Sequence, residues 1–95
     1  MAKEVSPEKL KEWINQKKDI QLIDVRESYE FNSGHIEGAK LIPLGTLSGR
    51  LKEINKKKPV VFICRSGARS GMATQIASSQ GYDAYNMTGG MLDWD

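Results

Sequence analysis

The sequence predicts an α/β domain built on a parallel sheet. Two short apolar runs, 20–25 and 59–64, have the composition of buried strands. Each is followed by residues with helical signals, and an alternation of strands and helices is typical of a parallel sheet. The length of 95 residues, of which 39% are hydrophobic, predicts one domain over residues 1–95. Its radius of gyration should be about 12 Å.

Composition and charge argue against several classes of protein. Fourteen Lys and Arg against twelve Asp and Glu give a formal net charge of +2, far below the basic excess of nucleic-acid-binding proteins. The longest apolar run, 60–64, is much shorter than the roughly 20 residues of a membrane helix. The only cysteine, Cys64, cannot form a disulfide within the chain, and the N-terminus has no apolar signal core. A cytoplasmic protein that binds neither nucleic acid nor membrane is expected.

The first predicted helix begins at Ser6-Pro7, directly after the polar N-terminus, and ends near Lys17. A serine at the N-cap accepts a hydrogen bond from an early amide, and proline at the first helical position lacks a donor that would be unpaired anyway. Leu10 and Ile14 follow at helical spacing. One face of this helix is therefore expected to be buried.

Two strands and two helices are predicted over the middle of the chain. The run 20–25 is a buried strand, 27–32 a brief helix capped by its glutamates, and 38–43 a short strand that ends at a proline. Apolar residues then recur every three or four positions at Leu44, Leu47, Leu51 and Ile54. This spacing predicts one amphipathic helix over 44–54.

The last part of the chain repeats the alternation of strand and helix. The β-branched run 59–64 is the most strand-like segment, with the cysteine as its last residue. A loop is predicted over 65–69, a helix over 70–80 ended by a glycine, and a strand over 82–87. A short turn opens at Gly89-Gly90.

Cys64 ends its predicted strand a few residues before a helix begins. In open α/β sheets, ligands bind beyond the carboxyl ends of the strands. The N-terminus of a helix carries unpaired amides and a partial positive charge, which stabilise a thiolate. Arg65 and Arg69 add two positive charges, and Gly67 allows a turn that directs successive amides into one anion-binding nest. The alternative, a small apolar core residue, explains neither the arginines nor the glycine.

Few chemistries fit a cysteine with so few partners. The chain has no second cysteine and a single histidine, His35, which disfavours a zinc site and dithiol exchange. Neither a metal nor a cofactor is expected. A preformed thiolate needs no base, so His35 is interpreted as a packed, hydrogen-bonded residue. What remains is nucleophilic attack on a sulfur atom or on a phosphoryl group.

The length of the loop separates these two substrates. Four residues lie between Cys64 and Arg69, one fewer than in the phosphate-binding C-x5-R loop. A tighter ring of amides suits a single sulfur atom better than a tetrahedral oxyanion. We expect Arg65 to contact the substrate and Arg69 to brace the loop.

Asp24 is expected to belong to the scaffold of the site. It lies near the end of a predicted central strand, where a carboxylate needs a cationic partner. Arg26 and Arg69 are the two candidates for that partner. We interpret the pair as a support for the loop rather than as a general acid.

Four motifs spread over almost the whole chain resemble the single-domain rhodanese family. They are Asp24-Val25-Arg26-Glu27, then Gly34-His35-Ile36-Glu37-Gly38-Ala39 with Ile42-Pro43-Leu44, then Cys64-Arg65-Ser66-Gly67-Ala68-Arg69-Ser70, and Gly89-Gly90 with Trp94. The resemblance implies a central, mostly parallel sheet of about five short strands with helices on both faces. It also implies a sulfurtransferase without a cofactor, in which Cys64 takes sulfane sulfur from a donor such as thiosulfate and passes it to cyanide or a thiol.

In that family the loop after the cysteine holds the persulfide through its amides. The corresponding residues here are Arg65, Ser66, Gly67, Ala68, Arg69 and Ser70. Two alternatives stay open. The first alternative to a sulfurtransferase is a carrier that receives persulfide from one protein and presents it to another. The second is a phosphatase or arsenate-type enzyme. The phosphatase branch of the fold has the longer loop, from which this sequence departs. The expected partners are a small sulfur donor and a protein that donates or accepts sulfur.

Overall fold

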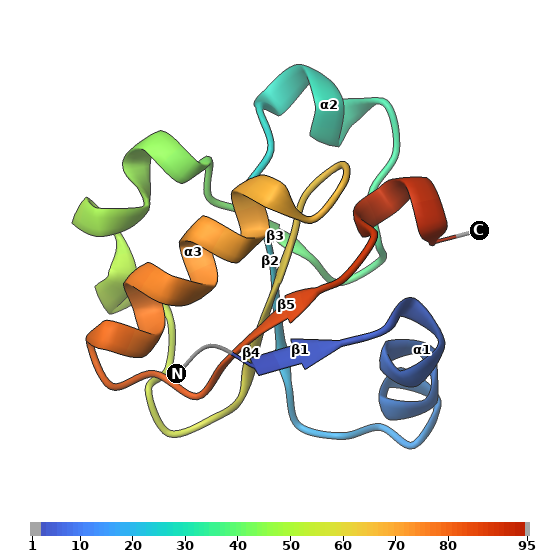
Figure 1. Ribbon diagram of the computed structural model, residues 1–95, viewed down its shortest axis with the longest axis horizontal. Helices are drawn as coiled ribbons and strands as arrows, with labels where there is room; N and C mark the ends of the chain where they lie inside the picture. The colour runs from blue at the N-terminus through green and yellow to red at the C-terminus, as the bar shows by residue number, and fades with distance from the viewer. Residues whose placement is uncertain (1–2, 95) are drawn as a thin grey trace.

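A computed structural model describes residues 3–94, and its five strands form one sheet in which every neighbouring pair is parallel (Figure 1). Met1, Ala2 and Asp95 of the predicted domain lie outside the described residues. The strands are β1 Lys3–Val5, β2 Gln21–Asp24, β3 Lys40–Leu41, β4 Val60–Ile63 and β5 Ala84–Met87. Their order in the sheet is β1-β5-β4-β2-β3. The predicted α/β class with about five short strands is confirmed, and the radius of gyration is 11.8 Å.

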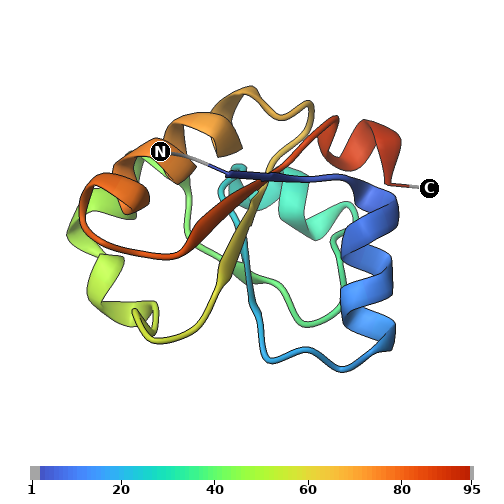
Figure 2. The ribbon, with the colours of Figure 1, turned by 60° about the horizontal axis from the view of Figure 1, so that its bottom comes forward.

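Helices cover both faces of the sheet (Figure 2). They are α1 Pro7–Asn15, α2 Ser28–Asn32 and α3 Ala68–Ser79, with three 3₁₀ helices, η1 Leu44–Gly49, η2 Leu51–Glu53 and η3 Gly90–Asp93. One buried cluster joins the sheet to α3, η1 and the residue after η2. A second cluster joins the other face to α1 and η3. Within residues 3–94 no helix has both the length and the apolar character needed to cross a membrane.

The central strand β4 is buried on both faces, as its apolar composition predicts. Val60 and Phe62 belong to the cluster beneath α3, whereas Val61 and Ile63 belong to the opposite cluster. Side chains alternate between faces along a strand, so the next residue, Cys64, returns to the α3 face and joins its cluster. Burial of each large apolar side chain contributes about 1.5–3 kcal/mol. The site thus follows a strand whose four residues are all buried.

The structure corrects two predicted boundaries next to the cysteine. Cys64 follows β4 instead of ending it. Helix α3 begins at Ala68, two residues earlier than predicted, with Gly67 as its N-cap. Arg69, which was predicted to lie in the loop, is therefore in the first turn of α3, together with Ser70. A serine-rich and glycine-rich composition favours a loop, but the glycine supplies the turn and the helix starts directly after it.

The prediction of one amphipathic α-helix over 44–54 is wrong. This segment forms η1 and η2, separated at Arg50. A spacing of three residues between buried positions also fits the three-residue turn of a 3₁₀ helix, and Leu47 is fully buried in this way. Gly45 and Gly49 weaken an α-helix here. The apolar residues therefore reach the core through tighter, shorter turns.

Strand lengths at the sheet edges also differ from the predictions. β3 has two residues, where a strand over 38–43 was expected. β1 was not predicted, because three residues with only Val5 buried carry no alternating pattern. It exists through its parallel pairing with β5. Helix α1 ends at Asn15, with Lys17 just beyond it in a left-handed conformation at φ 58°.

Candidate active site

Cys64 lies at the base of the turn that connects β4 to α3. The residue is buried, with 1% of its surface exposed. The backbone amide of Gly67 donates a hydrogen bond to its Sγ at 3.0 Å, and Ser70 Oγ lies 3.2 Å from the same sulfur. The structure thus brings the cysteine together with the amide nest expected from the sequence.

Two opposing effects act on the pKa of the Cys64 thiol. Burial raises this pKa, because the anion loses contact with water. Hydrogen bonding lowers it, through the Ser70 hydroxyl and the amides of Ser70, Gly67 and Ser66. The donors together outweigh burial, so the pKa lies below its usual value. The thiolate, which is the nucleophilic form of cysteine, is therefore more populated than in an ordinary cysteine.

The turn after the cysteine requires glycine at Gly67. Its φ is 104°, in the region where a residue with a side chain is strained. A Cβ at this position would also lie 3.3 Å from the amide nitrogen of Gly89. Because α3 starts at the next residue, the turn directs the amides at the N-terminus of α3 toward the sulfur. The partial positive charge of this helix end adds to the stabilisation of an anion.

The glycine pair Gly89-Gly90 holds the turn from the other side. The amide of Met91 donates to the carbonyl of Cys64 at 2.9 Å, and the amide of Leu92 donates to the carbonyl of Arg65 at 3.0 Å. A Cβ on Gly90 would lie 2.3 Å from that Arg65 oxygen. The sequence indicated only a turn here. Two successive glycines were the signal for a close approach of two backbones.

Arg69 is tied to α2 rather than to the carboxylate expected from the sequence. Its guanidinium makes two hydrogen bonds to Glu30, at 2.7 and 2.9 Å. Glu30 also accepts from the amide of Glu27 in a capping box at the start of α2. The pKa of Glu30 is lowered to about 2, and the hydrogen bond from the Arg69 guanidinium is the largest cause. The hydrogen bond from the Glu27 amide is the second cause. Sequence reasoning assigned Glu30 only the cap, because its partner is 39 positions away.

The buried pair of Asp24 and Arg26 forms as one of the two alternatives expected. Arg26 Nε lies 2.9 Å from Asp24 Oδ1, and Arg26 Nη2 lies 2.8 Å from Oδ2. The same nitrogen donates to the carbonyl of Gly34 at 2.8 Å. Asp24 is paired in register with Ile63 of β4. The pair therefore fixes the end of β2 and the segment after α2, beside the strand that carries the cysteine.

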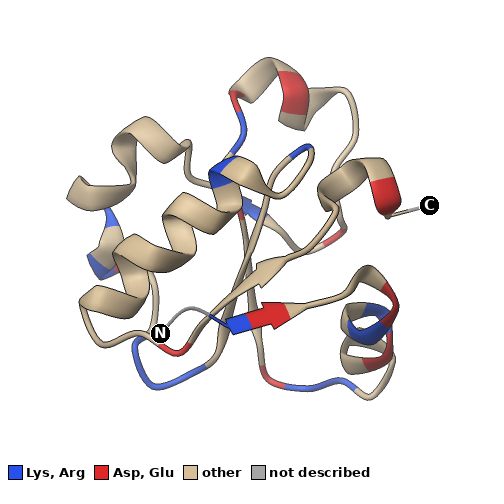
Figure 3. Cartoon of the chain, in the orientation of Figure 1, with Lys and Arg blue, Asp and Glu red and all other residues tan. Residues whose placement is uncertain are grey.

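The remaining loop residues lie at the surface. Arg65, Ser66 and Ala68 are exposed. Among residues 3–94 no carboxylate lies within ion-pair distance of the Arg65 guanidinium. Figure 3 shows basic residues on the turn and at the start of α3, close to an acidic stretch of α2. The charge of Arg69 is thus paired with Glu30, whereas the Arg65 side chain is exposed to solvent.

His35 makes local contacts in the structure. Its Nδ1 lies 2.8 Å from the carbonyl of Phe31, and its ring stacks on the Phe31 ring with centroids 3.6 Å apart. No three side chains of His, Cys, Asp or Glu between residues 3 and 94 gather closely enough to hold a metal ion.

Comparison with known proteins gives consistent matches over nearly the whole chain. The model of the rhodanese-like domain matches residues 6–95. The chain is 36% identical to a sulfurtransferase of Allochromatium vinosum over 99% of its own length and 89% of the relative's. It is 32% identical to the thiosulfate sulfurtransferase GlpE of Shewanella oneidensis, with 85% and 81% of the two chains covered.

A solved structure shows the same fold. The crystal structure of a rhodanese-like domain protein from Staphylococcus aureus superposes with a TM-score of 0.93. It is 34% identical, with 98% of this chain and 91% of that chain covered. This chain, with its cysteine below a glycine turn at the end of the central strand, therefore belongs to the rhodanese-like domain family.

Proposed function

We propose that this protein is a sulfurtransferase that moves sulfane sulfur from thiosulfate or a persulfide donor to cyanide or a thiol. The observation that carries the proposal is the position of Cys64 Sγ, 3.0 Å from the Gly67 amide and 3.2 Å from the Ser70 hydroxyl. Donors aimed at one atom stabilise an anionic sulfur there. The sulfurtransferase names of two relatives that cover most of the chain support the same chemistry. A reducing compartment such as the cytoplasm would keep the single thiol free.

In the proposed first step the Cys64 thiolate attacks the outer sulfur of thiosulfate. A new S–S bond forms, the bond between the two sulfur atoms of thiosulfate breaks, and sulfite leaves with the electron pair of that bond. The three negative charges before the step are found afterwards on the persulfide and on sulfite. This step requires no base, because the attacking species is the thiolate.

In the second step cyanide or a thiolate attacks the outer sulfur of the persulfide. Thiocyanate or a new persulfide leaves, and the Cys64 thiolate is restored. The amides of Ser66, Gly67 and Ser70 lower the pKa of the thiol, and we assign them to hold the terminal sulfur of the intermediate as well. Such preformed donors need no reorganisation during the reaction.

Arg65 is assigned to donor binding, and Arg69 to support of the turn. Thiosulfate carries two negative charges, and a guanidinium binds paired oxygens well. The Arg65 side chain is exposed, whereas Arg69 is held by Glu30 at 2.7 Å. The Asp24–Arg26 pair is assigned to the scaffold, since its hydrogen bonds link β2 to Gly34.

Incubation with thiosulfate should add the mass of one sulfur atom to the protein, and subsequent cyanide should remove it as thiocyanate. Intact-protein mass spectrometry and a colorimetric thiocyanate assay measure the two steps. Cys64→Ser should show neither. An unmodified mass would contradict the proposal. Hydrolysis of an aryl phosphate that is lost in Cys64→Ser would favour a phosphatase, and fast transfer to proteins with negligible thiocyanate release would favour a carrier.

Gly67→Ala should reduce thiocyanate release at least tenfold. The side chain strains a backbone at φ 104°, at a cost of about 1–3 kcal/mol, and turns the amide away from the sulfur. Gly45→Ala is the matched control, because a Cβ at position 45 meets nothing within 4 Å. Equal activity of the two variants in steady-state assays would refute the role of the Gly67 amide.

Arg65→Ala should raise the KM for thiosulfate about tenfold, the scale of one charge-assisted hydrogen bond. The value of kcat should change much less, since the guanidinium is assigned to the donor and not to the sulfur of Cys64. Lys57→Ala, which removes an exposed cation before the start of β4, at the opposite end of that strand from Arg65, controls for net charge. An unchanged KM in Arg65→Ala would remove Arg65 from the donor site.

Glu30→Gln should change the dependence of stability on pH. The pKa of Glu30 is lowered in the folded protein from 4.5 to about 2, so the ion pair with Arg69 contributes stability above about pH 4.5. That contribution is lost as the pH falls toward 2. The free energy of unfolding, measured with urea, should therefore fall less between pH 6 and pH 3 for Glu30→Gln than for the wild type. Parallel losses in both proteins would contradict the assignment.

A further inference from the structure

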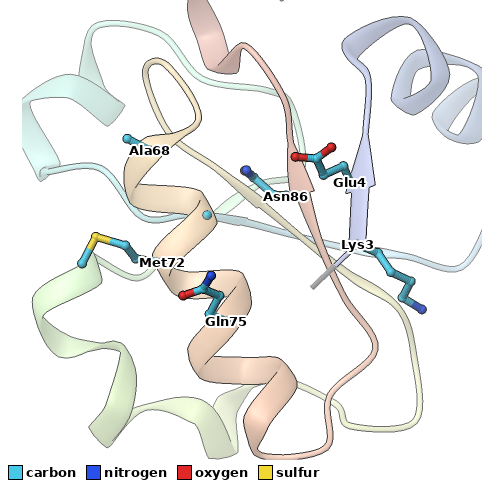
Figure 4. A pocket seen from close by; sticks show the side chains of 7 residues that line it. Lys3, Glu4, Ala68, Met72, Gln75 and Asn86 are labelled. Atoms are coloured by element: carbon cyan, nitrogen blue, oxygen red, sulfur yellow. The ribbon is translucent and has the colours of Figure 1, made fainter. Parts of the chain in front are cut away.

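Asn86 of β5 contacts both Gly67 and Ser70 but has no part in the steps above. Its side-chain nitrogen Nδ2 donates to the carbonyl of Gly67 at 3.1 Å. Its oxygen Oδ1 accepts from the hydroxyl of Ser70 at 2.6 Å. Figure 4 shows the side chain extending from β5 toward the start of α3. One amide group therefore contacts both residues whose atoms lie nearest to Cys64 Sγ.

The hydrogen-bond partners fix the orientation of this amide. The Gly67 carbonyl can only accept, so it must face Nδ2, and Oδ1 must face Ser70. The Ser70 hydroxyl has one proton and lies within reach of two groups, Asn86 Oδ1 at 2.6 Å and Cys64 Sγ at 3.2 Å. When Cys64 is a neutral thiol, the thiol, the Ser70 hydroxyl and Asn86 Oδ1 all have hydrogen-bond partners. The thiol donates to the Ser70 oxygen, and the Ser70 hydroxyl donates to Asn86.

An anionic sulfur on Cys64 changes this arrangement. A thiolate or persulfide has no proton to donate. If the Ser70 hydroxyl kept donating to Asn86, a lone pair of the Ser70 oxygen would face the anionic sulfur. The Ser70 hydroxyl stabilises the anion only when it turns its proton from Asn86 to the sulfur. Because one proton cannot serve both acceptors fully, Asn86 Oδ1 and the sulfur compete for it.

We propose that Asn86 is a positioning residue that controls, through Ser70, how much hydrogen bonding the anionic sulfur of Cys64 receives. The inference rests on the proposed function for the identity of that anion as a thiolate or persulfide. The hydrogen bond to the Gly67 carbonyl holds the turn while the Ser70 proton moves.

The surroundings of Asn86 favour such a change of partner. The residue is half-buried and lines a hollow of about 460 Å³ together with residues of β1 and α3 (Figure 4). Water in an open hollow can donate to Oδ1 after the Ser70 proton has turned away. With such a water in place, the exchange would leave no acceptor without a donor, and its cost would stay low.

Two variants should shift the pKa of the Cys64 thiol in opposite directions. Asn86→Leu removes the competing acceptor, and the pKa should fall by about 0.5–1, the scale of one neutral hydrogen bond. Asn86→Asp retains the Ser70 proton more strongly and repels the Gly67 carbonyl, and the pKa should rise by at least about 1. The measurement is the rate of alkylation by iodoacetamide against pH. A purely structural residue would shift the pKa in the same direction in both variants.

Gln75→Glu is the control for the added charge. Gln75 lines the same hollow and makes no hydrogen bond to Ser70 or Gly67, so its carboxylate should leave the pKa nearly unchanged. All variants keep the ionisable groups of the surrounding elements, which include Lys3, Glu4, Asp24, Arg26, Glu27, Tyr29, Glu30, Arg65, Arg69, Tyr85 and Asp93. A shift in Gln75→Glu equal to that of Asn86→Asp would overturn the proposal.

The Ser70→Ala background tests whether Asn86 acts through the serine. The downward shift of Asn86→Leu should disappear there, because no hydroxyl remains to be released. A shift that persists would overturn the proposal. Asn86→Ser, for which the same fall in pKa is expected, replaces the leucine variant if circular dichroism shows that the latter is unfolded. Alkylation requires no sulfur transfer, so failure of the proposed function and failure of this inference give separate results.

Discussion

The hydrogen bond from the Gly67 amide to the sulfur of Cys64, 3.0 Å long, exists only while the backbone keeps a left-handed turn. That turn requires a glycine with a φ of 104°. It also requires the neighbouring backbone at Gly90 to lie so close that a Cβ would meet the Arg65 carbonyl at 2.3 Å. The amides of η3 complete the clamp by binding the carbonyls of Cys64 and Arg65. The backbone conformation at Gly67 and the close approach at Gly90 thus determine where the turn amides point.

Two opposing effects set the acidity of the Cys64 thiol, and the hydrogen-bond donors outweigh burial. Burial raises the pKa of the Cys64 thiol, whereas the Ser70 hydroxyl and the turn amides lower it. A thiolate loses nucleophilicity as its pKa falls, and the best attacking thiol has a pKa near the ambient pH. The nearest arginine in α3 is neutralised by Glu30. Glu30 therefore offsets the positive charge that Arg69 brings to the site, while the donors nearest to the sulfur are the Gly67 amide and the Ser70 hydroxyl.

Patterns in consecutive residues predicted the centre of the fold. Contacts between residues far apart in the sequence could not be predicted from such patterns. The apolar run of β4 and the glycine turn before α3 are properties of a few consecutive residues, and both were read from the sequence. β1 depends on pairing with β5, more than 80 positions away. The contacts of Glu30 with Arg69 and of Asn86 with Ser70 likewise need the tertiary structure. The 3₁₀ helices η1 and η2 were missed because their apolar spacing also fits an α-helix.

The order of the strands explains why support for the sulfur comes from distant parts of the chain. β4 lies in the middle of the sheet, between β2 and β5, and parallel strands end at the same edge. The end of β2 therefore brings the Asp24–Arg26 pair and, through α2, the carboxylate of Glu30. The end of β5 brings Asn86 and the glycine pair before η3. A cysteine after an edge strand would have only one such neighbour, so the central position of β4 is what allows the turn to be held from both sides.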